Sequence, residues 1–97
     1  MKFKVIWSPR SKEEFGDVLD YLESEFGKNA ALKCLEDVES ILESIAVFPY
    51  LFKAYQGQRI RKAVVHKNLS VFYAVTSDFI ELLSFWDNRR NPKKLKL

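Results

Sequence analysis

Five basic residues in the second half of the chain are the first candidates for binding or catalysis. Arg59 and Arg61 share one face of a predicted strand because side chains alternate along a strand, and Lys62 points to the other face. Arg89 and Arg90 follow the last predicted strand. Clustered cations of this kind bind polyanions or acidic protein surfaces. The alternative is that they form surface salt bridges with helix carboxylates, which are common and individually weak.

Two further polar residues lie close to these cations in the sequence. His66 could act as a base because imidazole titrates near neutrality, although a solvent-exposed turn histidine beside Lys67 is the simpler interpretation. Asp87 could orient Arg89 or Arg90, or it could be a turn residue at the end of a strand.

Composition excludes several classes of protein. The chain has 97 residues, of which 47% are hydrophobic and 30% charged, so we expect a single globular domain over residues 1–97. One cysteine, Cys34, and one histidine exclude an internal disulfide, thiolate zinc sites and multi-histidine centres, and we expect no metal and no cofactor. No apolar stretch approaches the roughly 20 residues of a membrane span. We therefore expect a cytoplasmic protein with no membrane partner.

Charge is divided unevenly along the chain. Residues 1–57 carry 7 Lys and Arg against 10 Asp and Glu, a net charge of −3. Residues 58–97 carry 9 against 3, a net charge of +6. The basic second half favours an acidic or polyanionic partner, and a solvated charged surface is the alternative.

The chain is predicted to begin with a strand followed by a helix. Residues 2–7 place Phe3, Val5 and Trp7 on one side and Lys2, Lys4 and Ile6 on the other, which predicts a short strand. Ser8 can cap a helix whose first turn holds Pro9. Ser11 and Glu14 form a possible capping box and a second candidate start. The sequence leaves both starts open.

Two helices should then form an antiparallel hairpin. Gly27 ends the first helix, Asn29 can cap the second, and Pro49 ends the second. The junction is short, which favours antiparallel neighbours. The apolar stripes of the two helices are Phe15, Val18, Leu19, Leu22 and Phe26, and then Ala31, Cys34, Leu35, Val38, Ile41, Leu42 and Ile45.

The second half changes to the two-residue period of strands. An aromatic loop over residues 48–58 precedes three β-rich runs at 59–65, 69–75 and 79–86, which predict an antiparallel meander. A basic tail follows from Asp87 to Leu97. The order of elements is an N-terminal strand, a two-helix antiparallel hairpin and a three-stranded antiparallel meander, an α+β two-layer domain. The sequence alone leaves the pairing of the first strand undetermined.

The predicted meander is apolar on both faces, although a helix pair can cover only one. Strict alternation puts Ile80, Leu82 and Trp86 opposite Phe79, Leu83 and Phe85. One apolar sheet face should then be partly open, and such patches mark partner surfaces. The alternative is that the tail and the aromatic loop cover it.

The order of elements and the C-terminal segment resemble the RelE/ParE toxin superfamily of bacterial type II toxin–antitoxin modules. The resemblance covers nearly the whole chain. It includes the opening strand running into Ser8-Pro9-Arg10, then Arg59-Ile60-Arg61-Lys62 and Val71-Phe72-Tyr73. Its most specific part is Phe85-Trp86-Asp87-Asn88-Arg89-Arg90-Asn91-Pro92, which resembles the ParE-type branch, often labelled plasmid stabilisation proteins.

This resemblance implies a toxin that a cognate antitoxin neutralises by wrapping around it. We expect the antitoxin to contact Phe72, Tyr73, Phe85 and Trp86. A homo-oligomer is also conceivable for such a chain.

Two targets are known in the superfamily, DNA gyrase for ParE-like members and mRNA on the ribosome for RelE-like members. We expect the ParE-like, non-catalytic activity, because no Tyr, His, Asp or Glu follows Arg90. The residues expected to bind the target are Arg59, Arg61, Lys62, Arg89 and Arg90. If the chain is instead a ribosome-dependent endoribonuclease, its catalytic candidates are Arg61, His66, Arg89 and Arg90. A degenerate toxin that only binds antitoxin is the third interpretation.

Overall fold

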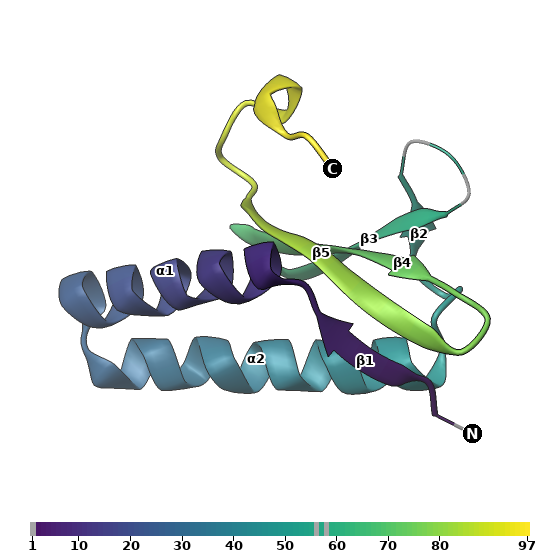
Figure 1. The fold of residues 1–97 in the computed structure, drawn as a ribbon. Coiled ribbons are helices and arrows are strands. Elements are labelled where there is room, and N and C mark those ends of the chain that lie inside the picture. Colours follow the sequence, from purple (N-terminus) through teal and green to yellow (C-terminus); the bar gives the residue numbers. More distant parts are fainter. Residues whose placement is uncertain (1, 56, 58) are drawn as a thin grey trace.

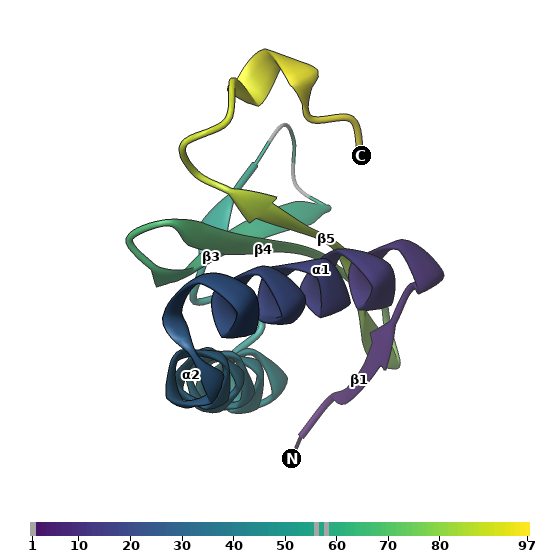
Figure 2. The same cartoon turned by 90° about the vertical axis from the view of Figure 1, so that its left-hand side faces the viewer.

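The structure is a computed structural model that describes residues 2–55, 57 and 59–97. The chain runs through β1 (Lys4–Trp7), α1 (Pro9–Phe26), α2 (Lys28–Val47), β2 (Lys53–Ala54), β3 (Ile60–His66), β4 (Leu69–Val75), β5 (Phe79–Asp87) and the short 3-10 helix η1 (Pro92–Lys94). The two helices lie side by side against one face of the sheet, and the tail after β5 rises on the other side (Figures 1 and 2). The predicted α+β class is confirmed.

The sheet has five strands in the order β1-β5-β4-β3-β2. The predicted three-stranded meander is present as β3, β4 and β5. It gains β2, a two-residue antiparallel strand inside the predicted loop 48–58, whose Gln56 and Gln58 lie outside the described residues. The first strand pairs in parallel with the last, with Lys4 opposite Phe79 and Trp7 opposite Leu82.

Ser8 begins the first helix. Its side chain accepts a 3.1 Å hydrogen bond from the Ser11 backbone N–H, and Pro9 occupies the first turn. Ser11 lies inside the helix, fully buried, and its hydroxyl donates to the Ser8 carbonyl at 2.8 Å. Of the two starts that the sequence left open, the structure has the one at Ser8.

The turn between the helices depends on Gly27. Its φ of 94° is left-handed backbone that glycine adopts without strain, and its N–H donates to the Glu23 carbonyl at 3.0 Å. Gly27 also precedes α2, which begins at Lys28. The predicted cap at Asn29 is therefore wrong, because Asn29 already lies within the first turn. The single residue between the helices leaves no room for a separate cap.

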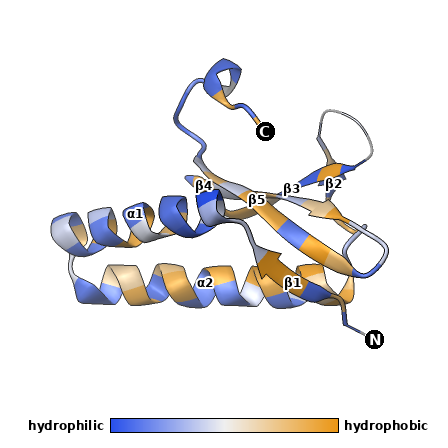
Figure 3. Cartoon of the chain, in the orientation of Figure 1, coloured by the Kyte–Doolittle hydropathy of each residue, from blue (hydrophilic) through white to orange (hydrophobic). Residues whose placement is uncertain are grey.

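The core lies between the helix hairpin and the sheet. Phe15 of α1 and Val38 and Ile45 of α2 pack there with apolar residues of β3, β4 and β5. Figure 3 shows β1 and much of β5 as hydrophobic and the tail as largely hydrophilic. Phe26, the last residue of the predicted α1 stripe, is 67% exposed, because the helices extend beyond the sheet (Figure 1). No helix in the described part of the chain combines the length and the apolarity that crossing a membrane requires.

A β-bulge at Leu83 changes which side chains of β5 face the helices. The pairing with β4 runs from Phe72 opposite Ser84 to Tyr73 opposite Leu82, so Leu83 is an extra residue. A single extra residue reverses the faces of all that follow. Phe85 therefore joins the core cluster with Leu82, and Trp86 points to the far face. The strict alternation predicted from sequence is wrong for these two residues.

The far face of the sheet is covered at its large aromatic residues. Phe72 and Trp86 are 1% and 6% exposed. Tyr55 packs edge-on against Phe72 with ring centroids 4.7 Å apart, and Arg90 lies over Trp86. The expected open apolar face is therefore wrong at these positions, because the aromatic loop and the tail contribute the covering side chains.

Candidate functional site

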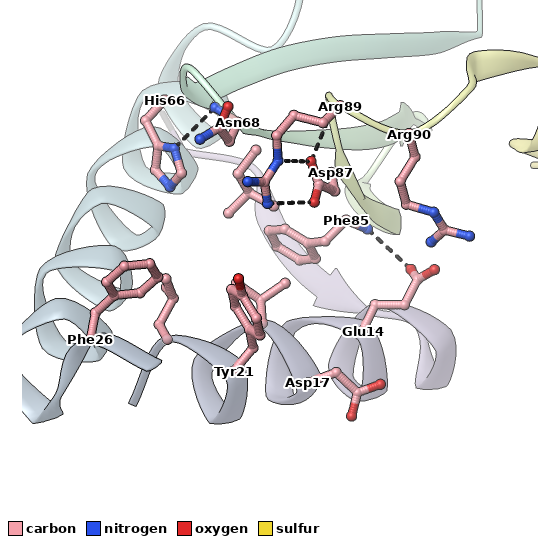
Figure 4. A pocket seen from close by; sticks show the side chains of 13 residues that line it. Glu14, Asp17, Tyr21, Phe26, His66, Asn68, Phe85, Asp87, Arg89 and Arg90 are labelled. Atoms are coloured by element: carbon pink, nitrogen blue, oxygen red, sulfur yellow. Dashed lines mark hydrogen bonds and ion pairs between the residues drawn. The ribbon is translucent and has the colours of Figure 1, made fainter. Parts of the chain in front are cut away.

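An open cleft of about 540 Å³ lies between α1 and the end of the sheet from which the tail departs (Figure 4). Its apolar lining is Val18, Tyr21, Leu22, Phe26, Leu69 and Phe85. Its polar lining is Glu14, Asp17, His66, Asn68, Asp87, Arg89 and Arg90. The cleft thus brings together three of the sequence-predicted site residues, His66, Arg89 and Arg90, from β3 and from the segment after β5.

Asp87 orients Arg89 through a two-point ion pair. Arg89 Nε lies 3.0 Å from Asp87 Oδ1, and Nη2 lies 2.8 Å from Oδ2. The Arg89 backbone N–H also donates to Oδ1 at 2.9 Å. These hydrogen bonds hold the pKa of Asp87 below its usual value. Of the two roles open to Asp87 from sequence, the structure shows that it both orients Arg89 and closes the turn.

Trp86 holds the second arginine. The guanidinium carbon of Arg90 lies 4.4 Å from the centroid of the Trp86 ring, a cation–π distance. Trp86 is buried, whereas Arg90 is exposed. The tryptophan therefore forms a fixed base beneath a solvent-facing cation.

Asn88 fixes the turn that carries both arginines. Its backbone N–H donates to the Asn68 carbonyl at 2.9 Å, and its side-chain amide donates to the Lys67 carbonyl at 3.3 Å. Its Oδ1 accepts a 2.8 Å hydrogen bond from the buried hydroxyl of Ser70. The β3–β4 turn and the end of β5 are thereby joined. Sequence reasoning missed Asn88, although an Asn directly after a strand is a recognisable turn signal.

Glu14 reaches the edge of β5 from α1. Its Oε1 accepts hydrogen bonds from the Phe85 backbone N–H at 3.1 Å and from the Ser84 hydroxyl at 2.8 Å. The pairing with β1 stops at Leu82, so Phe85 has no strand partner on that side. The carboxylate satisfies a backbone donor that would otherwise be left at the sheet edge. The sequence suggested Glu14 only as a capping-box residue.

His66 ends β3 and is half-buried rather than a freely exposed turn residue. Its Nδ1 accepts a 3.3 Å hydrogen bond from the Asn68 backbone N–H. Its Nε2 lies 4.0 Å from the sulfur of Cys34. Cys34 is buried, as the helix pattern predicted, and burial raises the pKa of its thiol. Both ring nitrogens of His66 therefore face groups of the chain itself.

The other predicted cations lie outside the cleft lining. Arg61 Nη1 donates to the carbonyls of Phe52 at 2.7 Å and Tyr50 at 3.4 Å, and its guanidinium stacks on the Tyr50 ring. Lys62 lies on the far face with its Nζ 5.9 Å from the centre of the Phe72 ring. Arg59 is exposed just before β3. The structure thus divides the predicted target-binding residues into two separate groups.

The four residues expected to bind antitoxin are all interior. Phe72, Tyr73, Phe85 and Trp86 are between 0% and 6% exposed. The hydroxyl of Tyr73 donates to the Pro49 carbonyl at 2.7 Å, and burial raises the pKa of Tyr73 to about 12. These side chains stabilise the folded chain as it stands, and none of the four offers an exposed surface.

The cleft has few features of a metal site. Among the described residues, no group of three or more His, Cys, Asp or Glu side chains is arranged to hold a metal ion. What the cleft offers is an apolar floor, an acidic wall from α1 and two oriented guanidinium groups.

Residues 5–92 match the family described as the ParE toxin of the type II toxin-antitoxin system parDE. The match spans most of the chain, which therefore belongs to the ParE toxin family. The chain is accordingly a toxin of the ParE/RelE superfamily of type II toxin–antitoxin systems. No curated protein matched the sequence.

Several solved structures share this fold. A chain of the chromosomal ParDE toxin–antitoxin system from P. aeruginosa is 13% identical, with 89% of this chain and 96% of that chain covered and a TM-score of 0.77. The YoeB dimer from Staphylococcus aureus is 14% identical, with 89% and 97% covered and a TM-score of 0.63. The E. coli DinJ-YafQ toxin-antitoxin complex gives 13% identity, 92% and 96% coverage and a TM-score of 0.59.

Proposed function

We propose that this chain is a ParE-like toxin that inhibits DNA gyrase by binding it through Arg89 and Arg90, and that a cognate antitoxin neutralises it. The observation that carries the proposal is the pair of oriented guanidinium groups at the rim of the cleft. Two cations held in place and facing outward are suited to binding an acidic protein surface.

The character of the cleft supports a protein target over a nucleic acid. Glu14, Asp17 and Asp87 line the same cleft as the two arginines. A polyanion in this cleft would meet three carboxylates along with the guanidinium groups. A protein surface, which can present both apolar and charged side chains, suits the apolar floor and the mixed rim better.

The environment of the proton-transfer candidates also supports a non-catalytic toxin. Tyr73 is buried and bonded to the Pro49 carbonyl, so its hydroxyl is inaccessible to a substrate. His66 has one ring nitrogen bonded to Asn68 and the other facing Cys34. Cleavage of RNA by attack of a ribose hydroxyl needs a positioned proton acceptor and donor.

One observation favours the second candidate function, a RelE-like ribosome-dependent endoribonuclease. His66 and Arg89 line the same cleft, so a base and a cation lie at one site. In this alternative His66 would turn away from Cys34 to take a proton from the ribose hydroxyl. Arg89 and Arg90 would stabilise the charge that develops on the phosphate.

Pulse labelling after induction in a bacterial host separates the two functions. The gyrase proposal expects thymidine incorporation to fall within the first minutes while methionine incorporation continues. An early fall in methionine incorporation with DNA synthesis spared would contradict it and favour the endoribonuclease. Growth with both labels unaffected, for a folded and expressed protein, would indicate a chain that only binds antitoxin.

The arginines are tested by an Arg89→Ala, Arg90→Ala double variant. It should relieve growth inhibition and lose binding to purified gyrase. The matched control is Lys12→Ala with Lys28→Ala, which removes the same charge from exposed positions of the helix hairpin. Equal toxicity of the double variant and the wild type, at equal expression, would contradict the assignment of Arg89 and Arg90 as gyrase-binding residues.

A further inference from the structure

The two arginines are held by the two residues that end β5, each by a different interaction. Asp87 holds Arg89 with two hydrogen bonds in the manner of a fork. Trp86 holds Arg90 through the face of its ring at 4.4 Å. We propose that Trp86 and Asp87 are positioning residues, which set Arg90 and Arg89 as donors for carboxylate groups of the protein target. This inference rests on the proposed function.

The N–H groups left over after these contacts are what a partner would meet. Arg89 uses its Nε and one Nη2 hydrogen on Asp87, which is two of the five donors of a guanidinium. Within residues 2–55, 57 and 59–97, the Arg90 guanidinium has no hydrogen-bond acceptor. Contact with a ring face holds a cation without occupying an acceptor. Both groups therefore keep donors for two-point hydrogen bonds to a carboxylate.

The anchoring residues are themselves rigid. Trp86 is 6% exposed and lies in register with Ser70 of β4. Ser70 bonds Asn88, which bonds in turn to Lys67 and Asn68 of the neighbouring turn. The positions of the tryptophan ring and of the Asp87 backbone are thereby fixed by the sheet. A free arginine side chain loses considerable rotamer freedom on binding, and a side chain already ordered in the unbound protein loses less.

Carboxylates are favoured over phosphates by the charge around the pair. Asp87 already neutralises half of the charge of the two arginines, and Glu14 and Asp17 face the same cleft. A single carboxylate pairs with one guanidinium without approaching this acidic wall. A phosphate backbone brings one charge per nucleotide and would lie along the wall. The ligand class inferred here is therefore an acidic patch of a folded protein.

The experiment compares Trp86→Leu, Trp86→Phe and Asp87→Asn with the wild type, using purified gyrase as the probe and growth inhibition as a second measurement. Removal of the ring in Trp86→Leu should weaken binding to gyrase roughly three- to thirty-fold. This range corresponds to the energies of cation–π contacts between exposed and buried sites. Trp86→Phe keeps an aromatic face and should retain most of the binding. Asp87→Asn should weaken binding roughly three- to ten-fold, because one hydrogen bond of the fork becomes a donor–donor contact.

A spectroscopic measurement separates positioning from general destabilisation. The ring current of Trp86 should shift the side-chain NMR signals of Arg90 upfield in the wild type and in Trp86→Phe, but not in Trp86→Leu. The matched control is Trp7→Leu, which removes the other tryptophan, stacked on Phe85 with ring centroids 5.4 Å apart. That variant should leave the Arg90 signals and the binding to gyrase close to wild type.

Each outcome decides one of the two proposals. If Arg89→Ala with Arg90→Ala leaves gyrase binding intact, the proposed function fails. If that double variant loses binding but folded Trp86→Leu and Asp87→Asn bind as the wild type does, only the positioning inference fails. If Trp86→Leu does not fold, the positioning inference is judged by two other results: the binding of Asp87→Asn to gyrase and the upfield shift of the Arg90 signals in the wild type. Arg90-dependent binding of a single-stranded RNA oligomer, stronger than that of gyrase, would overturn the carboxylate assignment.

Discussion

The hydroxyl of Tyr73 donates a 2.7 Å hydrogen bond to the carbonyl oxygen of Pro49, 24 residues earlier in the chain. This bond ties the centre of the meander to the residues that follow α2. Arg61 reinforces it nearby by donating to the carbonyl of Phe52. The loop after the helix hairpin is therefore held to the sheet by two side chains that sequence reasoning considered for other roles.

The Tyr73 phenol predicts a loss of stability in alkali. Burial raises the pKa of Tyr73 to about 12 from the ordinary value of 10.0, so the unfolded chain releases the proton first. The contribution to stability is complete below pH 10 and is lost as the pH rises to 12, which lowers the free energy of unfolding by roughly 2–3 kcal/mol.

The variant Tyr73→Phe should lack this loss in alkali, and at pH 7 it should be about 1 kcal/mol less stable than the wild type. Urea unfolding between pH 7 and 11.5 measures both effects. Tyr50→Phe, at a 62% exposed position, is the control. Parallel curves for the wild type and Tyr73→Phe would contradict the prediction.

Glu14 should contribute to stability through the backbone of β5. Glu14→Ala removes the acceptor of the Phe85 N–H and the Ser84 hydroxyl, and both groups are largely shielded from water. We expect a loss of roughly 1–3 kcal/mol in the free energy of unfolding. Glu13→Ala removes the same charge from an exposed neighbour and should change stability by less than about 0.5 kcal/mol. Equal effects of the two variants in denaturant unfolding would show that the edge contact contributes nothing.

The bulge at Leu83 can be tested by removing it. Deletion of Leu83 would join Leu82 directly to Ser84, so Leu82 and Phe85 would still face the helices and Ser84 and Trp86 the far side, in the native register with β4. The deletion variant should therefore fold, as judged by dispersed amide signals in NMR. Leu83→Ala keeps the extra residue and should also remain folded. Loss of dispersed signals in the deletion variant but not in Leu83→Ala would mean that folding requires the bulge itself.

The ion pair between Asp87 and Arg89 should make the stability of the fold depend modestly on pH in the acid range. Hydrogen bonds from Arg89 hold the pKa of Asp87 below its ordinary value of 3.8. The group therefore stabilises the fold above that value, and the contribution is lost as the pH falls below it. The pair is partly exposed, so the effect should be only a few tenths of a kcal/mol. Asp87→Asn should lower stability at pH 7 and match the wild type near pH 2. A difference that persists at pH 2 would point to packing instead.

Much of the fold is readable from local patterns in the sequence. Alternation over residues 69–75, the helical stripe around Val38 and Ile45, and the stop at Gly27 each depend on neighbours in the chain. The RelE/ParE resemblance is confirmed by the family match over residues 5–92. The arginines at positions 89 and 90 are candidates because of their type and their place after the last strand, and their role in binding a target stays a prediction.

What the sequence could not provide are contacts between distant residues. The bond from Phe85 to Glu14 joins residues 71 apart, and no local pattern specifies it. The bulge at Leu83 is a single inserted residue, and alternation on either side of it looks regular. The burial of Phe72 depends on Tyr55 folding back over it. For the same reason the residues expected to bind the antitoxin lie in the interior. Tyr55 and Arg90 cover Phe72 and Trp86, and Tyr73 and Phe85 belong to the core cluster.

The parallel pairing of β1 with β5 sets an order of events during protein synthesis. The ribosome makes Lys4–Trp7 first, and the strand that receives it, Phe79–Leu82, appears only near the end of these 97 residues. Until then β1 has no strand to pair with, and the nascent chain holds only the helix hairpin and the early meander. Arg89 and Arg90 follow directly after the last strand. A product that stops before Phe79 therefore lacks both the completed sheet and the arginine pair on which the proposed binding to gyrase depends.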